Sequence, residues 1–492
     1  MIRKTWALWL AAAVWLSGCT MIPKTTRPAA PIPAGWPSGA AYRQTEPVPG
    51  AALPGGLPWR EFFADERLRA IIEMALQNNR DLRVAALNVK RARALYGIQR
   101  AELLPAVDAV GSGIKQRVPA EISGTARSTI VEQYSASLGI SSWEIDFFGR
   151  IRSLEKRALA QYLATEQARR SAQILLVSEV ATAYLTLAAD RESVQLARST
   201  FETQQAAHNL IRRRFEVGLT NQLDVRQAQT RMDAARVQIA RFTDLAARDE
   251  NALNLLAGAP VPADLLPETL SAIAPLPEVS PGMSSAVLLS RPDILQAEDL
   301  LRAADANIGA ARAAFFPSIG LTTAVGTASG ELAHLFKSGT LVWNFAPQAV
   351  MPIFDARLWP ALKASRVDRE IAVAQYEGAI QAAFREVADA LARKGTLVDQ
   401  MAAQQSLVEA TAEAYRLSNA RYEKGIDIYL NVLDAQRSLY IAREAFIFIR
   451  LAKLANQVQL YTVLGGGADS FRSAEDTRAT GGRSPAATAT VP

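Results

Sequence analysis

Cysteine and histidine are scarce in this chain of 492 residues, and their scarcity excludes several kinds of chemistry. The one cysteine, Cys19, rules out a disulfide within the chain. The two histidines, His208 and His334, lie far apart and have no neighbouring cysteine, so they lack metal-ligand spacing. The sequence also has no glycine-rich phosphate loop before a lysine and no Gly-x-Ser-x-Gly turn. We therefore expect neither an enzyme nor a bound metal or cofactor.

Long apolar runs are also missing after the N-terminus. No later run approaches the roughly 20 residues that a membrane-spanning helix needs. This predicts that the chain is not a helical inner-membrane transporter. If the body enters a membrane, it must do so as a closed β-barrel. The net charge of +6 is spread among interspersed acids and bases, so nothing points to nucleic acid.

The first 18 residues have the features of a secretory signal peptide. Arg3 and Lys4 precede an apolar stretch, 5–16, that is too short to cross a bilayer. The following Leu-Ser-Gly-Cys19 resembles a bacterial lipoprotein signal, which implies cleavage before Cys19 and its attachment to lipid, palmitate included. Thr20, in place of an aspartate, resembles lipoproteins that are sorted to the outer membrane. The alternative is an incidental cysteine in an ordinary signal sequence.

The strongest positive feature is an internal repeat at a displacement of 207 positions. Arg214-Phe-Glu-Val-Gly218-Leu219 recurs as Arg421-Tyr422-Glu-Lys-Gly425-Ile426. Upstream the displacement becomes 212, which pairs Asp81 with Asp293. A duplication of this size predicts two structurally equivalent repeats, at residues 60–270 and 280–465.

Each repeat contains the same series of segments. The first helices are predicted at 65–103 and 293–315, ahead of Pro105 and Pro317. Long helices follow at about 148–257 and 358–464, interrupted by Gly218 and Gly425, which fit a helix end with left-handed backbone geometry. Outside the repeats, 19–58 is predicted to be a Pro-rich extended tether without a packed core, and 466–492 a disordered tail.

Between these helices, each repeat has one predicted β-hairpin, at about 105–146 and 317–354. Apolar residues such as Leu138 alternate there with Ser and Gly, and the loops are predicted at 111–129 and 326–339. The alternation is typical of transmembrane barrel strands, but a soluble hairpin packed on a core fits equally well. Four strands cannot close a barrel, which needs about eight or more, so a membrane-inserted form must be an oligomer.

The repeated turn motif, Phe/Tyr-Glu-x-Gly-x(4)-Leu-x-Val-x-x-Ala-Gln, and Trp143-Glu-Ile-Asp-Phe-Phe-Gly-Arg150 resemble the outer-membrane efflux proteins of the TolC, OprM and NodT type. The resemblance covers about residues 60–465, and Cys19 with its tether resembles the lipoprotein branch. It implies a mainly α fold with a small β part. Three chains would form a 12-stranded barrel, four strands each, continuous with a long α-helical coiled-coil barrel. A collar near 60–78 and 258–290, with the C-terminal end, would surround it.

The resemblance also implies a function. The chain would be the passive outer-membrane channel of a tripartite efflux pump that exports drugs or other toxic small molecules. Its partners would be two more copies of itself, a periplasmic adaptor (membrane fusion) protein, and an inner-membrane pump of the resistance–nodulation–division type. A conduit for type I protein secretion is the alternative within this class. A lipid-anchored periplasmic coiled-coil scaffold is the alternative from another class.

Site residues follow from the same resemblance. Leu430 and Asp434 match a constriction pair, which in a trimer would form an apolar ring and a ring of mutually repelling acids at the periplasmic tip. Tyr422 matches a latch position of this gate, whereas Asn431 and Asp427 differ from the family pattern. The alternatives are coiled-coil core for Leu430 and a solvated charge for Asp434. The residues expected to contact the adaptor, or only to shape the turns, are Gly218, Leu219, Gly425 and Ile426.

Overall fold

The computed structural model describes residues 21–24, 26–42, 57–124, 127–278 and 284–466. The predicted signal peptide, Cys19 and nearly all of the predicted tail lie outside these residues. The chain divides into two compact units, which are described separately. Unit 1 contains Asn88–Glu166 and Gln296–Tyr376 with the described residues up to Ala29. Unit 2 contains Gln167–Leu295 and Glu377 onward with the described residues from Ala30 to Leu87. Each unit therefore draws on both sequence repeats.

The elements recur in the same order in the two repeats. The first repeat has α4 (Arg80–Ala101), β1 (Asp108–Val118), β2 (Thr129–Ile145), α5 (Arg150–Glu216) and α6 (Gln222–Ala257). The second has α7 (Pro292–Ala313), β3 (Ser318–Ser329), β4 (Leu341–Val350), α8 (Leu358–Glu423) and α9 (Tyr429–Val463). The predicted mainly helical fold with a small β part is confirmed.

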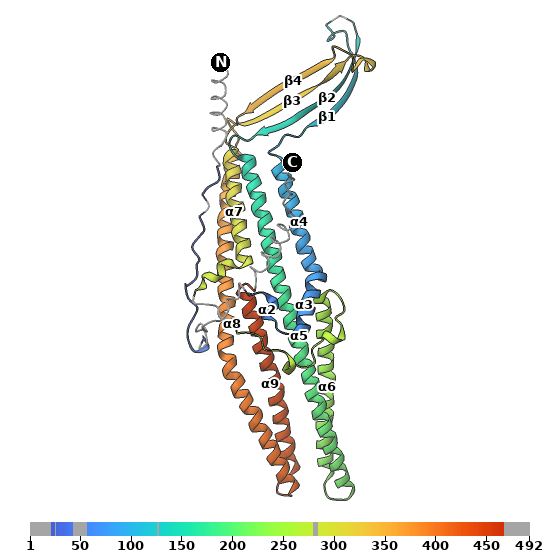
Figure 1. The fold of residues 1–492 in the computed structure, drawn as a ribbon, viewed down its shortest axis with the longest axis vertical. Coiled ribbons are helices and arrows are strands. Elements are labelled where there is room, and N and C mark those ends of the chain that lie inside the picture. Colours follow the sequence, from blue (N-terminus) through green and yellow to red (C-terminus); the bar gives the residue numbers. More distant parts are fainter. Residues whose placement is uncertain (1–20, 25, 43–56, 125–126, 279–283, 467–492) are drawn as a thin grey trace, which may run out of the picture. The chain divides into compact units, whose positions relative to one another are not determined.

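Unit 1 contains a four-stranded antiparallel sheet in the order β1-β2-β3-β4 (Figure 1). The two hairpins are those predicted, and β2 pairs with β3 to join the repeats, with a register shift between Ile140 and Trp143. The predicted loops were too long, because 111–118 and 326–329 belong to strands. Their Gly and Ser content looked loop-like, but cross-strand pairing outweighs the weak β propensity of these residues.

One face of this sheet is apolar. Leu138, Val325 and Trp343 lie opposite one another across three strands, so they share a face. Each exposes more than half of its side-chain surface, and Trp343 exposes 74%. The opposite face carries small or polar residues such as Ser137 and Asn344 at the intervening positions, together with the exposed apolar residues Val110, Ile114 and Val342. Within the described residues, this apolar face has no protein layer over it.

The helix predicted at 65–103 is two helices, α3 (Glu66–Asn78) and α4, separated at Asn79. Asn79 has an extended backbone, and its side-chain oxygen accepts a hydrogen bond from the Leu82 N–H at 2.9 Å. This cap satisfies one of the free N–H groups at the start of α4. The Asn79 amide also donates to the Leu256 carbonyl at 3.0 Å, so a contact distant in sequence supports the break in addition to the local cap.

Shorter elements complete unit 2. The α2 helix (Trp59–Phe62) packs near the end of α9, where Phe62 stacks on Tyr461 with ring centroids 4.1 Å apart. Short 3-10 helices lie at Ala263–Leu265, Leu270–Ala272 and Ser285–Ser290. Two more 3-10 turns, Ala40–Tyr42 in unit 2 and Leu332–His334 in unit 1, complete the described elements.

The described part of the predicted tether is extended apart from the turn at Ala40–Tyr42, but it is packed rather than free. In unit 1, Arg27 lies 2.9 Å from the Glu298 carboxylate and donates to the Tyr376 hydroxyl at 3.0 Å. In unit 2, Trp36 stacks on Phe384 with centroids 5.4 Å apart. Proline prevents a regular helix here, but the intervening side chains still contact α7 and α8.

One helix, α5, contains a segment that is long and apolar enough to cross a membrane by length and composition. The expectation that no such run exists was therefore too strict. Fifty-six per cent of that segment is buried within the chain, as in the core helix of a soluble protein, and a single such helix is weak evidence for a span.

Candidate functional site: the two helical turns

The turns that join α5 to α6 and α8 to α9 have the same backbone hydrogen bonds. Gly218 donates to Phe215 O at 2.9 Å and Leu219 to Arg214 O at 2.8 Å; Gly425 donates to Tyr422 O at 2.9 Å and Ile426 to Arg421 O at 3.0 Å. This is the Schellman pattern of a helix C-terminus, which needs a left-handed residue. Gly218 and Gly425 have φ values of 77° and 72°, so the predicted geometry is confirmed.

After the turns the repeats differ. Asn221 caps α6, because its side-chain oxygen accepts from the Asp224 N–H at 3.0 Å. Ile428 occupies the cap position of α9 and offers no side-chain acceptor. A capping side chain contributes about 1 kcal/mol to helix stability, so the start of α9 lacks this contribution and depends on its packing instead.

A small core joins the two turns within unit 2. Ile211, Ala228, Val432 and Leu433 are almost fully buried together with Tyr429, and Tyr422 packs against this cluster. The four helices α5, α6, α8 and α9 all contribute to it. Burial of these side chains, at about 25 cal/mol per Å² of apolar surface, is the main force that holds the turns together.

Tyr422 connects the two repeats. Its hydroxyl accepts a hydrogen bond from Arg214 at 2.7 Å, and the same guanidinium lies 5.2 Å from the centre of its ring. The Tyr422 ring also lies 5.1 Å from that of Tyr429. The contact therefore combines a charge-assisted hydrogen bond with a cation–π interaction.

The matching arginine of the second repeat behaves differently. Arg421 pairs with Asp427 at 2.6 Å, inside its own turn. The first repeat has Thr220 in place of Asp427, and the Thr220 hydroxyl donates instead to Asp224. Without an acid in its own turn, Arg214 reaches across to α8. The residue replacement in the turn thus determines which arginine crosses between repeats.

The two predicted gate residues lie on one face of α9, one turn apart. Leu430 exposes 46% of its surface, so it is not part of the coiled-coil core of a single chain. Asp434 is exposed and pairs with Arg437 at 2.5 Å. Sequence reasoning missed Arg214 and Arg437. The identity of Arg214 with Arg421, and the three-residue spacing of Asp434 and Arg437, were the available signals.

The exposures of the residues that form the turns are high. Leu219 exposes 75% and Ile426 59% of their surface, and open space surrounds Gly218 and Gly425. The structure thus packs Tyr422 against the core of the turns, while it leaves Leu219, Ile426, Leu430 and Asp434 exposed.

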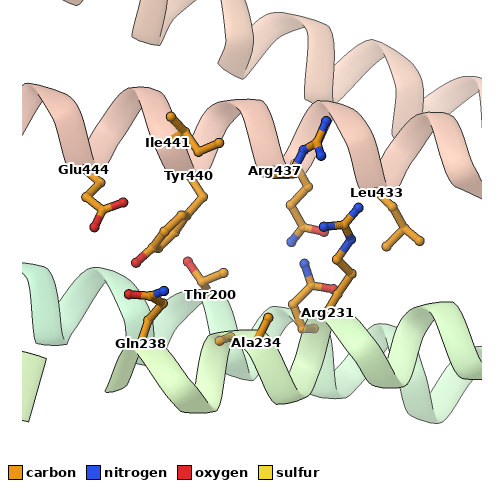
Figure 2. Close-up of a pocket in the computed structure, with 12 residues that line it drawn as sticks. Thr200, Arg231, Ala234, Gln238, Leu433, Arg437, Tyr440, Ile441 and Glu444 are labelled. Carbon is orange, nitrogen blue, oxygen red and sulfur yellow. The ribbon is translucent and has the colours of Figure 1, made fainter. Parts of the chain in front are cut away.

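Next to the gate residues lies a cavity of about 250 Å³ between α5, α6 and α9 (Figure 2). Arg437, which pairs with Asp434, lines it together with Arg231 and Gln238 of α6. Tyr440 also points into it, and its hydroxyl has no hydrogen-bond partner among the described residues. Burial raises the pKa of Tyr440 to about 12, so the phenol keeps its proton. The cavity lining is therefore mixed: it contains donors such as Arg231 and Arg437, the acid Glu444, and apolar side chains such as Leu433.

These observations define a class: an internally duplicated, mainly helical protein with a small antiparallel sheet and two packed helical turns. A model of the outer membrane efflux protein family matches residues 71–259 and 283–466, and the chain belongs to this family. The predicted resemblance is confirmed. Because members of this family are channels, which are passive conduits, the chain is not an enzyme.

Known proteins resemble the chain along almost its whole length. The probable efflux pump outer membrane protein TtgC of Pseudomonas putida is 50% identical over 453 residues, which cover 92% of this chain and 93% of that protein. The outer membrane protein OprJ of Pseudomonas aeruginosa is 42% identical and covers 96% of this chain and 98% of its own length. The crystal structure of the open state of the Neisseria gonorrhoeae MtrE outer membrane channel has a TM-score of 0.82 and 36% identity, and covers 92% of this chain and 99% of its own.

Proposed function

We propose that this chain is the outer-membrane channel of a tripartite efflux pump. It would work as a homotrimer, receiving small toxic molecules from an inner-membrane pump of the resistance–nodulation–division type through a periplasmic adaptor. Relatives at 50% identity are named as efflux pump proteins for toluene and for antibiotics, which supports this substrate class. Cys19 would carry the lipid anchor once residues 1–18 are removed. The two sequence repeats, 60–270 and 280–465, would each supply one hairpin and one tip turn.

The observation that supports the proposal most strongly is that the four-stranded sheet has two unpaired edges and an uncovered apolar face within the described residues. Within the described residues, β1 and β4 each pair with one strand only, so both edges offer free N–H and C=O groups. The apolar face that contains Leu138, Val325 and Trp343 is uncovered. Three copies joined edge to edge would pair every edge strand and present this face to lipid, as a membrane barrel requires.

Arginine on either side of one strand tests the barrel. Trp343→Arg would put a charge on the lipid face of β4, at a cost of up to about 2–4 kcal/mol per chain. Asn344→Arg, the matched control, would put the same charge on the opposite face. We expect the first variant to lose the heat-modifiable trimer in outer-membrane fractions and the second to keep it. Equal trimer recovery in both variants would contradict a membrane barrel, as a soluble scaffold would tolerate either charge.

We further propose that Leu430 and Asp434 form the periplasmic gate and that Tyr422 helps to latch it. Their outward position on α9 suits contact with other copies around a threefold axis. The Arg214–Tyr422 contact would hold the two repeats together while the gate is closed. Gly218, Leu219, Gly425 and Ile426, exposed at the turns, would face the adaptor.

Single-channel conductance tests the gate. Asp434→Ala removes the proposed acidic ring, so we expect a several-fold larger conductance in reconstituted bilayers. Tyr422→Phe keeps the ring but removes the acceptor for Arg214, and should give a smaller increase. Gln227→Ala changes the position that matches Asp434 in the first repeat and serves as the control. An unchanged conductance for Asp434→Ala would remove these residues from the gate.

A further inference from the structure

Two aspartates face each other between α5 and α6, and the second repeat has neither of them. At a displacement of 207, Asp190 of α5 matches Leu397 of α8, and Asp249 of α6 matches Asn456 of α9. Asp190 exposes 6% of its surface, as buried as the leucine that replaces it. All four residues belong to unit 2. The first repeat therefore has two acids at these positions, Asp190 buried and Asp249 half-buried, where the second repeat has none.

Asn456 shows what this position does in the second repeat. It exposes 3% of its surface, and its side-chain amide donates to the Ala390 carbonyl of α8 at 3.1 Å. It therefore bonds α9 to α8 at any pH. A carboxylate at the matching position has no hydrogen to donate, and only its protonated form could bond in a similar way.

In the first repeat the two carboxyl groups bond to each other. The Asp190 side chain shares a hydrogen bond with Asp249. The other Asp249 oxygen, Oδ2, is buried and has no partner among the described residues. A hydrogen bond between two carboxyl groups requires one proton, because two carboxylates are both acceptors and repel each other.

Among the described residues, the aspartate pair has no ion-pair partner of its own. Arg191 of α5 pairs with Glu250 of α6 at 3.1 Å, and Arg450 of α9 pairs with Glu192 of α5 at 3.1 Å. Arg241 of α6 is the cation whose charge acts on Asp190, and it acts on Glu444 of α9 as well.

Burial, followed by the hydrogen bond with Asp249, raises the pKa of Asp190 to about 7. Burial also raises the pKa of Asp249, while the hydrogen bond from Asp190 opposes that change. These directions agree with one proton that resides on Asp190.

We propose that Asp190 and Asp249 form a proton-dependent clasp between α5 and α6, closed when they share a proton and loosened when both are ionised. In the second repeat, where Leu397 and Asn456 occupy these positions, the contact between α8 and α9 does not respond to pH. In the folded protein, the Asp190 carboxyl group keeps its proton at pH values above 3.8, the ordinary pKa of an aspartate. The stabilisation is therefore complete below pH 4 and is lost as the pH rises through about 7. The clasp does not depend on the proposed channel function.

Hydrogen exchange of the full-length protein in detergent, corrected for intrinsic rates, tests the clasp. Between pH 6 and pH 8.5 we expect the protection of the backbone amides of 183–197 and 242–256 against exchange to fall by about tenfold. This change in free energy equals that of a shift of one pKa unit. The matching segments of the second repeat, 390–404 and 449–463, are the internal control and should not change. Asp249→Asn, which installs the residue of the second repeat, should abolish the pH dependence.

Two further measurements make the test decisive. The infrared band of a protonated carboxyl group should be present at pH 6, absent at pH 8.5, and altered in Asp249→Asn. Glu250→Gln removes a neighbouring acid that is already paired with Arg191, so it should leave the pH dependence intact. A flat exchange profile in the natural protein, or the same pH response in Asp249→Asn, would overturn the clasp.

Discussion

The two repeats share one fold but differ in the partner of a matched pair of acids, Asp293 and Glu386 in the second repeat and Asp81 and Glu179 in the first. In the second repeat, buried Arg291 contacts Asp293 at 2.7 Å and Glu386 at 2.8 Å, and donates to the Val463 carbonyl at 2.7 Å. In the first repeat, the matching Asp81 and Glu179 remain, but Asn79 replaces the arginine.

Asn79 keeps only part of the role of Arg291. Its amide donates to Leu256 O, which matches Val463 O, so the hydrogen bond to the end of the last helix is preserved. The charge is not preserved. Partial desolvation, followed by the charge of the nearby Asp81, raises the pKa of Glu179 above its usual value, although the side chain remains exposed to solvent. The comparison teaches that the duplicated backbone depends on the hydrogen bond, whereas the ion pairs can vary between copies.

The largest effect is expected for Arg291→Asn, which would give the second repeat the residue of the first. It leaves Asp293 and Glu386 without their cation. Removal of one partner from a buried pair costs about 3–5 kcal/mol, and we expect about 2–3 here because both carboxylates are partly exposed. Thermal unfolding monitored by circular dichroism measures the loss. A melting temperature equal to that of the unaltered protein would show that the ion pairs contribute nothing.

The glycines that end α6 and α9 give a second matched comparison. Gly258 and Gly465 both have positive φ, so alanine at either costs about 1–2 kcal/mol. A β-carbon at Gly258 would also lie 2.5 Å from the Asn78 carbonyl oxygen, whereas at Gly465 the nearest atom is 3.9 Å away. We therefore expect Gly258→Ala to lower the melting temperature more than Gly465→Ala. The reverse order would contradict the close backbone approach at Gly258.

Gly309 and Gly97 match at the displacement of 212 and differ in what covers them. A β-carbon at Gly309 would lie 2.6 Å from Ile22 and 2.8 Å from Ser153 Oγ, but at Gly97 it would meet nothing within 4 Å. Gly309→Ala should therefore loosen the N-terminal segment and speed its cleavage by added protease. Gly97→Ala should leave cleavage unchanged and stabilise α4 by about 0.5–1 kcal/mol. Equal cleavage rates in the two variants would show that Ile22 does not depend on Gly309.

The smallest effect is expected for Asn79→Arg, which would give the first repeat the cation of the second. Glu179 is exposed, so the electrostatic gain should stay below about 1 kcal/mol; the substitution also removes the Asn79 cap, a loss that does not depend on pH. Because the folded pKa of Glu179 is raised, its ionisation opposes folding above the ordinary Glu value. The gain should therefore appear at pH 8 and disappear below about pH 4. Denaturant unfolding at the two pH values measures it, and a gain that is the same at both would exclude the proposed electrostatic cause.

Much of this fold was readable from local patterns. The glycine turns were predicted because Gly218 and Gly425 recur in one motif, and left-handed helix ends favour glycine for steric reasons. The hairpins followed from the alternation of apolar and small residues. The break at Asn79 was missed, although asparagine at a helix N-cap is a local signal; only its second hydrogen bond, to a carbonyl 177 positions away in sequence, was not readable. The docking of Arg27 and Trp36 was missed for the same reason, since the partners Glu298 and Phe384 lie far along the chain.

The candidate site divides in the same way. The motif alone singled out Tyr422, Leu430 and Asp434, and the lipoprotein-like signal singled out Cys19, which lies outside the described residues. The partner of Tyr422 could not be predicted, because it depends on Thr220 leaving Arg214 without an acid in its own turn.

The sequence by itself determined that the protein is duplicated and mainly helical, with two glycine turns that interrupt its long helices. Hydrophobic periodicity and backbone sterics act within a few residues, so they can be predicted from the sequence. Only the tertiary structure decided that Arg214 crosses between repeats, that Arg291 and Asn79 share one hydrogen-bonding role, and that Asp190 meets Asp249. These contacts depend on which helix faces pack together, and burial then changes the cost of each charge.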